Sequence, residues 1–171
     1  MRVLEDRDDI SYAKVFFQRS GYITRAWAPA FLAARRDGAT FDDAYEDGKM
    51  SHAAKRVYDV VRAGGALPVH IIRQEAGFGK EEKSRFERAI VELQMRMYIT
   101  VSGRQQKRSN RGEEYGWASA VYCTTEAFWG EAVCAEAAAI PGTEAAERIA
   151  ARVRTLNPDV EAKRLAKFIR G

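Results

Sequence analysis

The basic residues of this sequence gather in one stretch, where they could neutralise the phosphates of a nucleic acid. Residues 80–111 hold nine Lys and Arg against four Asp and Glu, a net charge of +5, whereas the whole chain of 171 residues carries +4. Cations that displace condensed counterions from phosphate give binding that weakens steeply with salt. The candidate contacts are Lys80, Lys83, Ser84, Arg85, Arg88, Arg104, Lys107, Arg108 and Arg111.

These candidates form a helical group and a loop group. Arg85 and Arg88 repeat at helical spacing, and arginines on a helix can read guanine edges, while the short Ser84 near the helix start suits a phosphate or base contact. Residues 104–111 place four cations within eight positions with no acid among them. Two alternatives stay open: a solvated helix face whose arginines pair with neighbours such as Glu92, and a hairpin tip that only adds solubility.

Other chemistry has little support in the sequence. The two histidines, His52 and His70, are too few for a metal cluster and have no Cys or Ser partner at a recognisable motif spacing. We expect Cys123 and Cys134 to be reduced, small hydrophobic residues, with a redox-sensor role for Cys123 as the alternative. Residues 77–80 lack the spacing of a phosphate-binding glycine loop. We therefore expect no catalytic residue, no metal and no cofactor.

Length and composition favour one compact unit. With 46% apolar and 30% charged residues, the chain can bury one substantial core and is too short for two ordinary enzyme domains. It has no run of about 18 uncharged apolar residues, and its first nine residues are too charged for a signal peptide. We expect a cytoplasmic protein that makes no contact with a membrane.

The elements that must position these residues divide the chain into three parts. Residues 1–50 are predicted to form an N-terminal helical arm, with one helix over 9–17 and another over 28–36. The acidic residues 42–47 are interpreted as a solvated linker. Residues 124–171 are predicted to form a C-terminal helical extension of three helices, the last capped by Asn157. Its Ala-rich helices could pack on a second copy to form a homodimer.

Residues 51–123 form a middle module with the clearest pattern. Ser51 can cap a helix that Gly64 and Gly65 end, and the apolar period changes from helical to alternating after residue 97. The predicted order is a helix over 51–64, an extended piece over 66–68, helices over 69–76 and 80–96, a strand over 98–102, a polar loop over 103–112 and a strand over 115–122.

This element order resembles a winged-helix DNA-binding domain. The resemblance implies that the third helix of the module enters the major groove of duplex DNA and that the loop between the strands, the wing, touches the backbone or the minor groove. The expected fold is therefore mainly α with a small β-hairpin, a winged helix-turn-helix core with N-terminal and C-terminal helical extensions.

A second resemblance concerns DNA repair. The segment Phe-Leu-Ala-Ala-Arg-Arg at 31–36, ahead of the winged helix, together with Glu-Leu-Gln at 92–94 and Gly103, is similar to small relatives of the AlkZ-type alkylpurine and crosslink DNA glycosylases. That family's enzymes resemble one another in a Gln-x-Gln pair that positions the hydrolytic water. This chain has only the adjacent Gln105 and Gln106, which would point to opposite faces of a hairpin. The kinship therefore implies DNA binding more than base excision.

The sequence favours a duplex DNA-binding winged-helix protein, either a regulator of transcription or a binder related to DNA repair. Two alternatives remain: a DNA glycosylase-like enzyme or its inactive relative, and a winged-helix module that docks proteins. The last would show binding that is insensitive to salt, because its contacts would not displace counterions.

Overall fold

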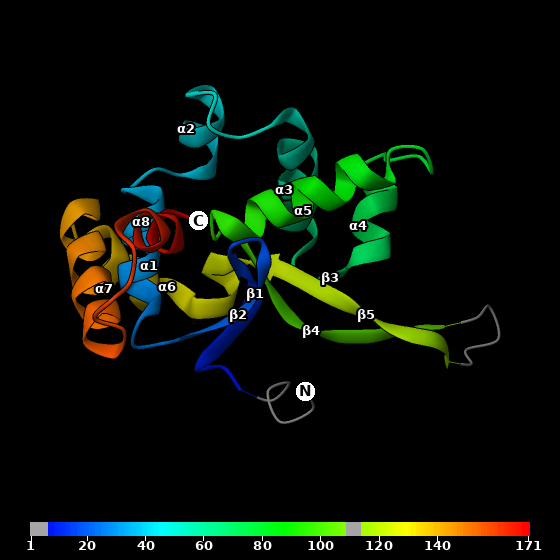
Figure 1. The fold of residues 1–171 in the computed structure, drawn as a ribbon. Helices are drawn as coiled ribbons and strands as arrows, with labels where there is room; N and C mark the ends of the chain where they lie inside the picture. The colour runs from blue at the N-terminus through cyan, green and yellow to red at the C-terminus, as the bar shows by residue number, and fades with distance from the viewer. Residues whose placement is uncertain (1–6, 109–113) are drawn as a thin grey trace.

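The chain folds as a mixed α/β protein in which helices lie over one side and at one end of an antiparallel sheet (Figure 1). The computed structural model describes residues 7–108 and 114–171. Within these residues five strands pair in the order β2-β1-β4-β5-β3. They are β1 (Ile10–Phe16), β2 (Arg19–Thr24), β3 (Leu67–Pro68), β4 (Ile99–Arg108) and β5 (Glu114–Thr124). The helices are α1 (Ala28–Arg36), α2 (Phe41–Glu46), α3 (His52–Gly64), α4 (Val69–Glu75), α5 (Lys83–Met95), α6 (Thr125–Ala138), α7 (Gly142–Leu156) and α8 (Ala162–Arg170).

The helix predicted over 9–17 is wrong, because this segment is strand β1, paired with β2 in a hairpin. Its alternate residues Ser11, Ala13 and Val15 are buried, which is the period of a strand. Both turn residues, Phe17 and Gln18, have positive φ, of 53° and 60°. A two-residue turn of this kind matches the twist of the strands but usually contains glycine or asparagine. Neither residue type is present at this turn, so the sequence gives no sign of a hairpin.

The acidic linker predicted over 42–47 is also wrong, because these residues belong to helix α2. The Thr40 hydroxyl accepts a hydrogen bond from the Asp43 amide at 3.2 Å, and the Asp43 carboxylate accepts one from the Thr40 amide at 2.9 Å. This reciprocal cap satisfies two amides, and the acidic side chains suit the positive end of the helix dipole. Phe41 and Ala44 are buried on the inner face.

The middle module follows the predicted order α3, β3, α4, α5, β4, β5. The Ser51 hydroxyl accepts a hydrogen bond from the Ala54 amide at 3.1 Å, which confirms the cap of α3. The strands are longer than predicted: β4 continues through most of the expected loop, to Arg108, and β5 starts at Glu114. With the N-terminal hairpin added beside β4, the sheet is larger than the small hairpin expected from the sequence.

Three helices follow the sheet, as predicted. Thr124 caps α6, accepting a hydrogen bond from the Ala127 amide at 3.2 Å. The residue before α8 is Glu161 and not Asn157, so the predicted cap of the last helix is wrong. None of the helices in the described segments is both long and apolar enough to cross a bilayer.

Buried side chains form two clusters. The first lies between α3, α4, α5 and the sheet and includes Val57, Ile72 and Leu93. The second joins β1 and α1 to α6, α7 and α8 and includes Trp129 and Ile149. The N-terminal and C-terminal parts of the chain therefore share one cluster.

Arg35 joins the two clusters through the ends of two helices. The residue is 7% exposed, and its guanidinium donates to the carbonyls of Met95 at 2.6 Å, Phe168 at 3.0 Å and Ile169 at 3.0 Å. These carbonyls belong to the last turns of α5 and α8, where backbone acceptors lack helical partners and a cation is favourable. Burial, with a smaller effect of Arg96, lowers the pKa of Arg35 to about 9, so the side chain is still a cation at neutral pH.

We predict that Arg35→Ala lowers the free energy of unfolding by at least about 3 kcal/mol, because it removes charged hydrogen bonds and leaves buried carbonyls unsatisfied. Urea denaturation followed by circular dichroism measures this. Arg62→Ala is the control, because this arginine is 47% exposed and its ion pairs, with Asp42 and Asp59, lie at the surface, so its loss should cost less than about 1 kcal/mol. Equal effects of the two substitutions would contradict the role given to Arg35.

Candidate functional site

The first half of α5 presents the predicted helical cations to solvent. Phe86, Ala89, Ile90 and Leu93 face the core and fix which side of the helix is outward. The five predicted contacts at the start of the helix and in the turn before it are all exposed: Lys80, Lys83, Ser84, Arg85 and Arg88. The spacing of the apolar residues therefore predicted correctly that these side chains point to solvent.

The ion pairs of this face are weak ones. Arg85 lies 3.4 Å from Glu82, and Lys83 lies 3.8 Å from Glu87, both at the exposed helix surface, where such pairs contribute little. Glu92 does not pair with these arginines; it accepts hydrogen bonds from the amide and hydroxyl of Ser51, at 2.8 and 2.6 Å. Within the described residues Arg88 makes no ion pair. An incoming phosphate would have few strong interactions to displace.

Arg56 fixes the turn that leads into α5. Its guanidinium donates to the Ala76 carbonyl at 3.0 and 2.6 Å, at the end of α4, and lies 4.0 Å from the centre of the Phe78 ring. It also lies 3.7 Å from Glu82, at the start of α5. This half-buried arginine thus sets the angle between the two helices, and with it the direction in which the cations of α5 point.

The second basic group lies on the hairpin formed by β4 and β5. Arg104, Lys107 and Arg108 are residues of β4 and pair in register with Ala120, Tyr115 and Glu114 of β5. Arg111 lies outside the described residues. Figure 1 shows the outer half of this hairpin projecting away from the helices, at the end of the molecule opposite α7.

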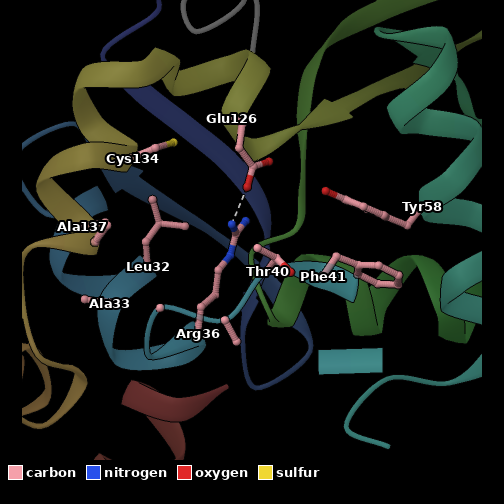
Figure 2. Close-up of a pocket in the computed structure, with 12 residues that line it drawn as sticks. Leu32, Ala33, Arg36, Thr40, Phe41, Tyr58, Glu126, Cys134 and Ala137 are labelled. Carbon is pink, nitrogen blue, oxygen red and sulfur yellow. Dashed lines mark hydrogen bonds and ion pairs between the residues drawn. The ribbon is translucent and has the colours of Figure 1, made fainter. Parts of the chain in front are cut away.

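A pocket of about 350 Å³ lies where the two clusters meet, and sequence reasoning missed it. Figure 2 shows Arg36 of α1 paired across it with Glu126 of α6. Arg36 also donates to the Met97 carbonyl and lies 4.4 Å from the centre of the Tyr98 ring. Its Nε is buried and has no hydrogen-bond partner in the part of the chain that the structure describes. The pocket is lined by Leu32, Ala33, Arg36, Gly38, Ala39, Thr40, Phe41, Tyr58, Glu126, Cys134, Ala137 and Ala138.

Tyr58 of α3 brings its hydroxyl into this pocket, toward Glu126 (Figure 2). Its ring stacks on Phe41 with 4.0 Å between centres, and the residue is only 6% exposed. The hydroxyl has no hydrogen-bond partner among the described residues. Burial, followed by the charge of Glu126, raises the pKa of Tyr58 to about 12, so at neutral pH the group is a phenol and a hydrogen-bond donor.

A break in α6 lets this helix line the pocket at two places. Gly130 has φ 78° and ψ 174°, a conformation that residues with a side chain rarely adopt. Glu126 precedes the break, whereas Cys134 and Ala137 follow it. An isolated glycine inside a helical pattern was the available sequence signal.

The remaining candidate residues show no activated chemistry. Burial raises the pKa of both the Cys123 and the Cys134 thiol, which is opposite to what a reactive thiolate needs. Gln94 is buried. Its side-chain oxygen accepts a hydrogen bond from the Lys14 amide at 2.9 Å, and its side-chain nitrogen donates to the Ile90 carbonyl at 3.0 Å, so Gln94 connects α5 to β1. In the parts of the chain that the structure describes, no three His, Cys, Asp or Glu residues gather in a way that could hold a metal ion.

We predict that Tyr58 makes the protein less stable as the pH rises from 10 to 12. Because its pKa is about 12 in the folded chain and near 10 in an unfolded one, deprotonation favours the unfolded state in this interval. In Tyr58→Phe the fall in unfolding free energy from pH 9 to pH 11 should be smaller, as measured by urea denaturation at each pH. An unchanged fall would contradict the buried phenol.

Comparison with known proteins gives one match. A family model described as AlkZ related matches residues 1–170, nearly the whole chain. No curated protein and no solved structure matches the sequence or the fold.

Proposed function

The chain belongs to the AlkZ-related family, and on that premise we propose that it is a duplex DNA-binding protein with a winged-helix core. The family supports an association with DNA repair, so we propose a repair-related binder in preference to a regulator of transcription. The observation that carries the proposal is the gathering of exposed cations on the first half of α5 and of basic residues on the β4–β5 hairpin.

The order of elements supports the winged-helix core. Helix α3, strand β3 and helices α4 and α5 precede the β4–β5 hairpin, and β3 pairs with the far side of β5. In winged helices the last helix of this order enters the major groove, which is wide enough for one helix. Helix α5 is the corresponding element here, and its exposed start carries the polar and basic groups.

The two basic groups have different roles in this proposal. Arg85 and Arg88 of α5 are candidates for guanine edges, because arginine matches the two acceptors of guanine in the major groove. Lys80, Lys83 and Ser84 suit phosphate oxygens. Arg104, Lys107 and Arg108 of the hairpin, together with Arg111, contact the backbone or the minor groove.

The family also supports a second candidate function, a glycosylase-like activity or an inactive relative of such an enzyme. The Gln-x-Gln pair of the resembling enzymes is absent from this sequence. Release of a free base from an alkylated duplex, measured by chromatography at high protein concentration, would establish this activity. An intact duplex after prolonged incubation would leave binding as the function.

We predict that changing Arg104, Lys107, Arg108 and Arg111 to Ala weakens binding to a random duplex at least about 10-fold at about 100 mM salt. The plot of log affinity against log salt should become shallower by about one unit for each phosphate that the variant no longer neutralises. Fluorescence anisotropy measures both. Binding that is insensitive to salt, or absent at low salt, would contradict the proposal and favour the protein-docking module.

We predict a comparable loss of affinity for the helix variant Lys83→Ala, Arg85→Ala, Arg88→Ala. The matched control removes three exposed cations from α7 and α8, at the other end of the molecule: Arg152→Ala, Arg154→Ala and Lys163→Ala (Figure 1). Both triple variants lower the net charge equally, so a site on α5 requires a clearly larger effect of the helix variant. Equal effects would reduce the interaction to general charge attraction.

A further inference from the structure

The pocket between α1, α2, α3 and α6 has a built polar end with an unused donor. The Tyr58 hydroxyl is aimed into it from a residue that is only 6% exposed, and no described residue accepts its proton. A molecule in the pocket that accepts from this hydroxyl would give the donor a partner. The rigid support of the ring by Phe41 means that Tyr58 keeps this direction.

The charges of the pocket cancel each other. Arg36 and Glu126 are paired, so neither is left as an unpaired counter-charge for a charged ligand. Glu126 is 45% exposed and already accepts from Arg36 through one oxygen, Oε1. Its other oxygen, Oε2, remains an acceptor, and Figure 2 shows it on the side of the pocket that faces Tyr58. An uncharged molecule that offers one acceptor and one donor side by side matches this end of the pocket.

The remaining walls are mostly apolar, with Thr40 and Cys134 as the exceptions. Leu32, Ala33, Phe41, Ala137 and Ala138 provide small aliphatic groups and one aromatic ring. A volume of about 350 Å³ lies near the lower end of the range of small-molecule sites, about 300–1,000 Å³. Such a space suits a flat ring with a single polar substituent.

We infer that this pocket binds a small uncharged aromatic amide, whose carbonyl accepts from Tyr58 and whose N–H donates to Glu126. The ring lies against Phe41 and the alanines of α6. The inference is independent of DNA binding, because the residues of the pocket lie on α1, α2, α3 and α6 and not on α5 or the hairpin.

Benzamide, benzoate and benzylamine test this inference, because they share one ring and differ in charge at neutral pH. Each is titrated into the ¹⁵N-labelled full chain, and the amide resonances of Ala33, Thr40 and Ala137 are followed. Benzamide should shift these resonances and saturate at about millimolar concentration. Benzoate and benzylamine should bind at least about 10-fold more weakly, because a full charge loses hydration in the pocket and the paired Arg36 and Glu126 offer no net counter-charge to offset that cost.

Two variants examine the polar end. Tyr58→Phe should lower the affinity for benzamide about 3- to 10-fold, which is the effect of losing one hydrogen bond. Tyr22→Phe, which changes an exposed residue of β2, should leave this affinity unchanged. Glu126→Gln should reverse the preference toward benzoate, because Arg36 then lacks its counter-charge. Glu131→Gln, exposed on the same helix, is the control. Absence of saturable benzamide binding, equal binding of benzoate to the unmodified chain, or an unchanged affinity in Tyr58→Phe would overturn the inference.

Discussion

Two adjacent arginines at the end of α1, Arg35 and Arg36, bind backbone carbonyls of segments that are distant in sequence. Both proposed sites depend on these contacts. Arg35 binds the last carbonyls of α5 and α8, so the end of α5 is fixed relative to the helices of the second cluster. Arg36 binds the Met97 carbonyl, where the chain leaves α5 for β4, and forms the charged wall of the pocket. The position of the end of α5, the start of the hairpin and one wall of the pocket are therefore set by one short segment.

The middle module was predictable because its signals are local. Ser51 as a cap, the glycines after α3 and the change of apolar period after α5 each act within a few residues. The N-terminal hairpin was not predictable, because its turn at Phe17 and Gln18 lacks glycine and the apolar residues of its strands also fit a helix. The reciprocal cap of α2 was present in the sequence, but the acidic residues around it suggested a linker.

The cations of α5 were predicted because exposure follows from the apolar face of a single helix. The pocket was not predicted, because Arg36, Tyr58 and Glu126 come from three helices that are distant in sequence. Only the packing of the two clusters brings these residues together. The break at Gly130 and the pairing of Arg36 with Glu126 are tertiary features as well. Sequence periodicity tells which side chains are buried, but not which of them share a cavity.

Hydrogen exchange of the full chain, with and without a saturating random duplex, is the most direct test of DNA binding by α5 and the hairpin, because it locates the binding surface without any substitution. We expect slower exchange in residues 80–88 and in the β4–β5 hairpin, with α7 unchanged. Slower exchange confined to α7 and α8, or no change in α5 and the hairpin at saturation, would contradict it.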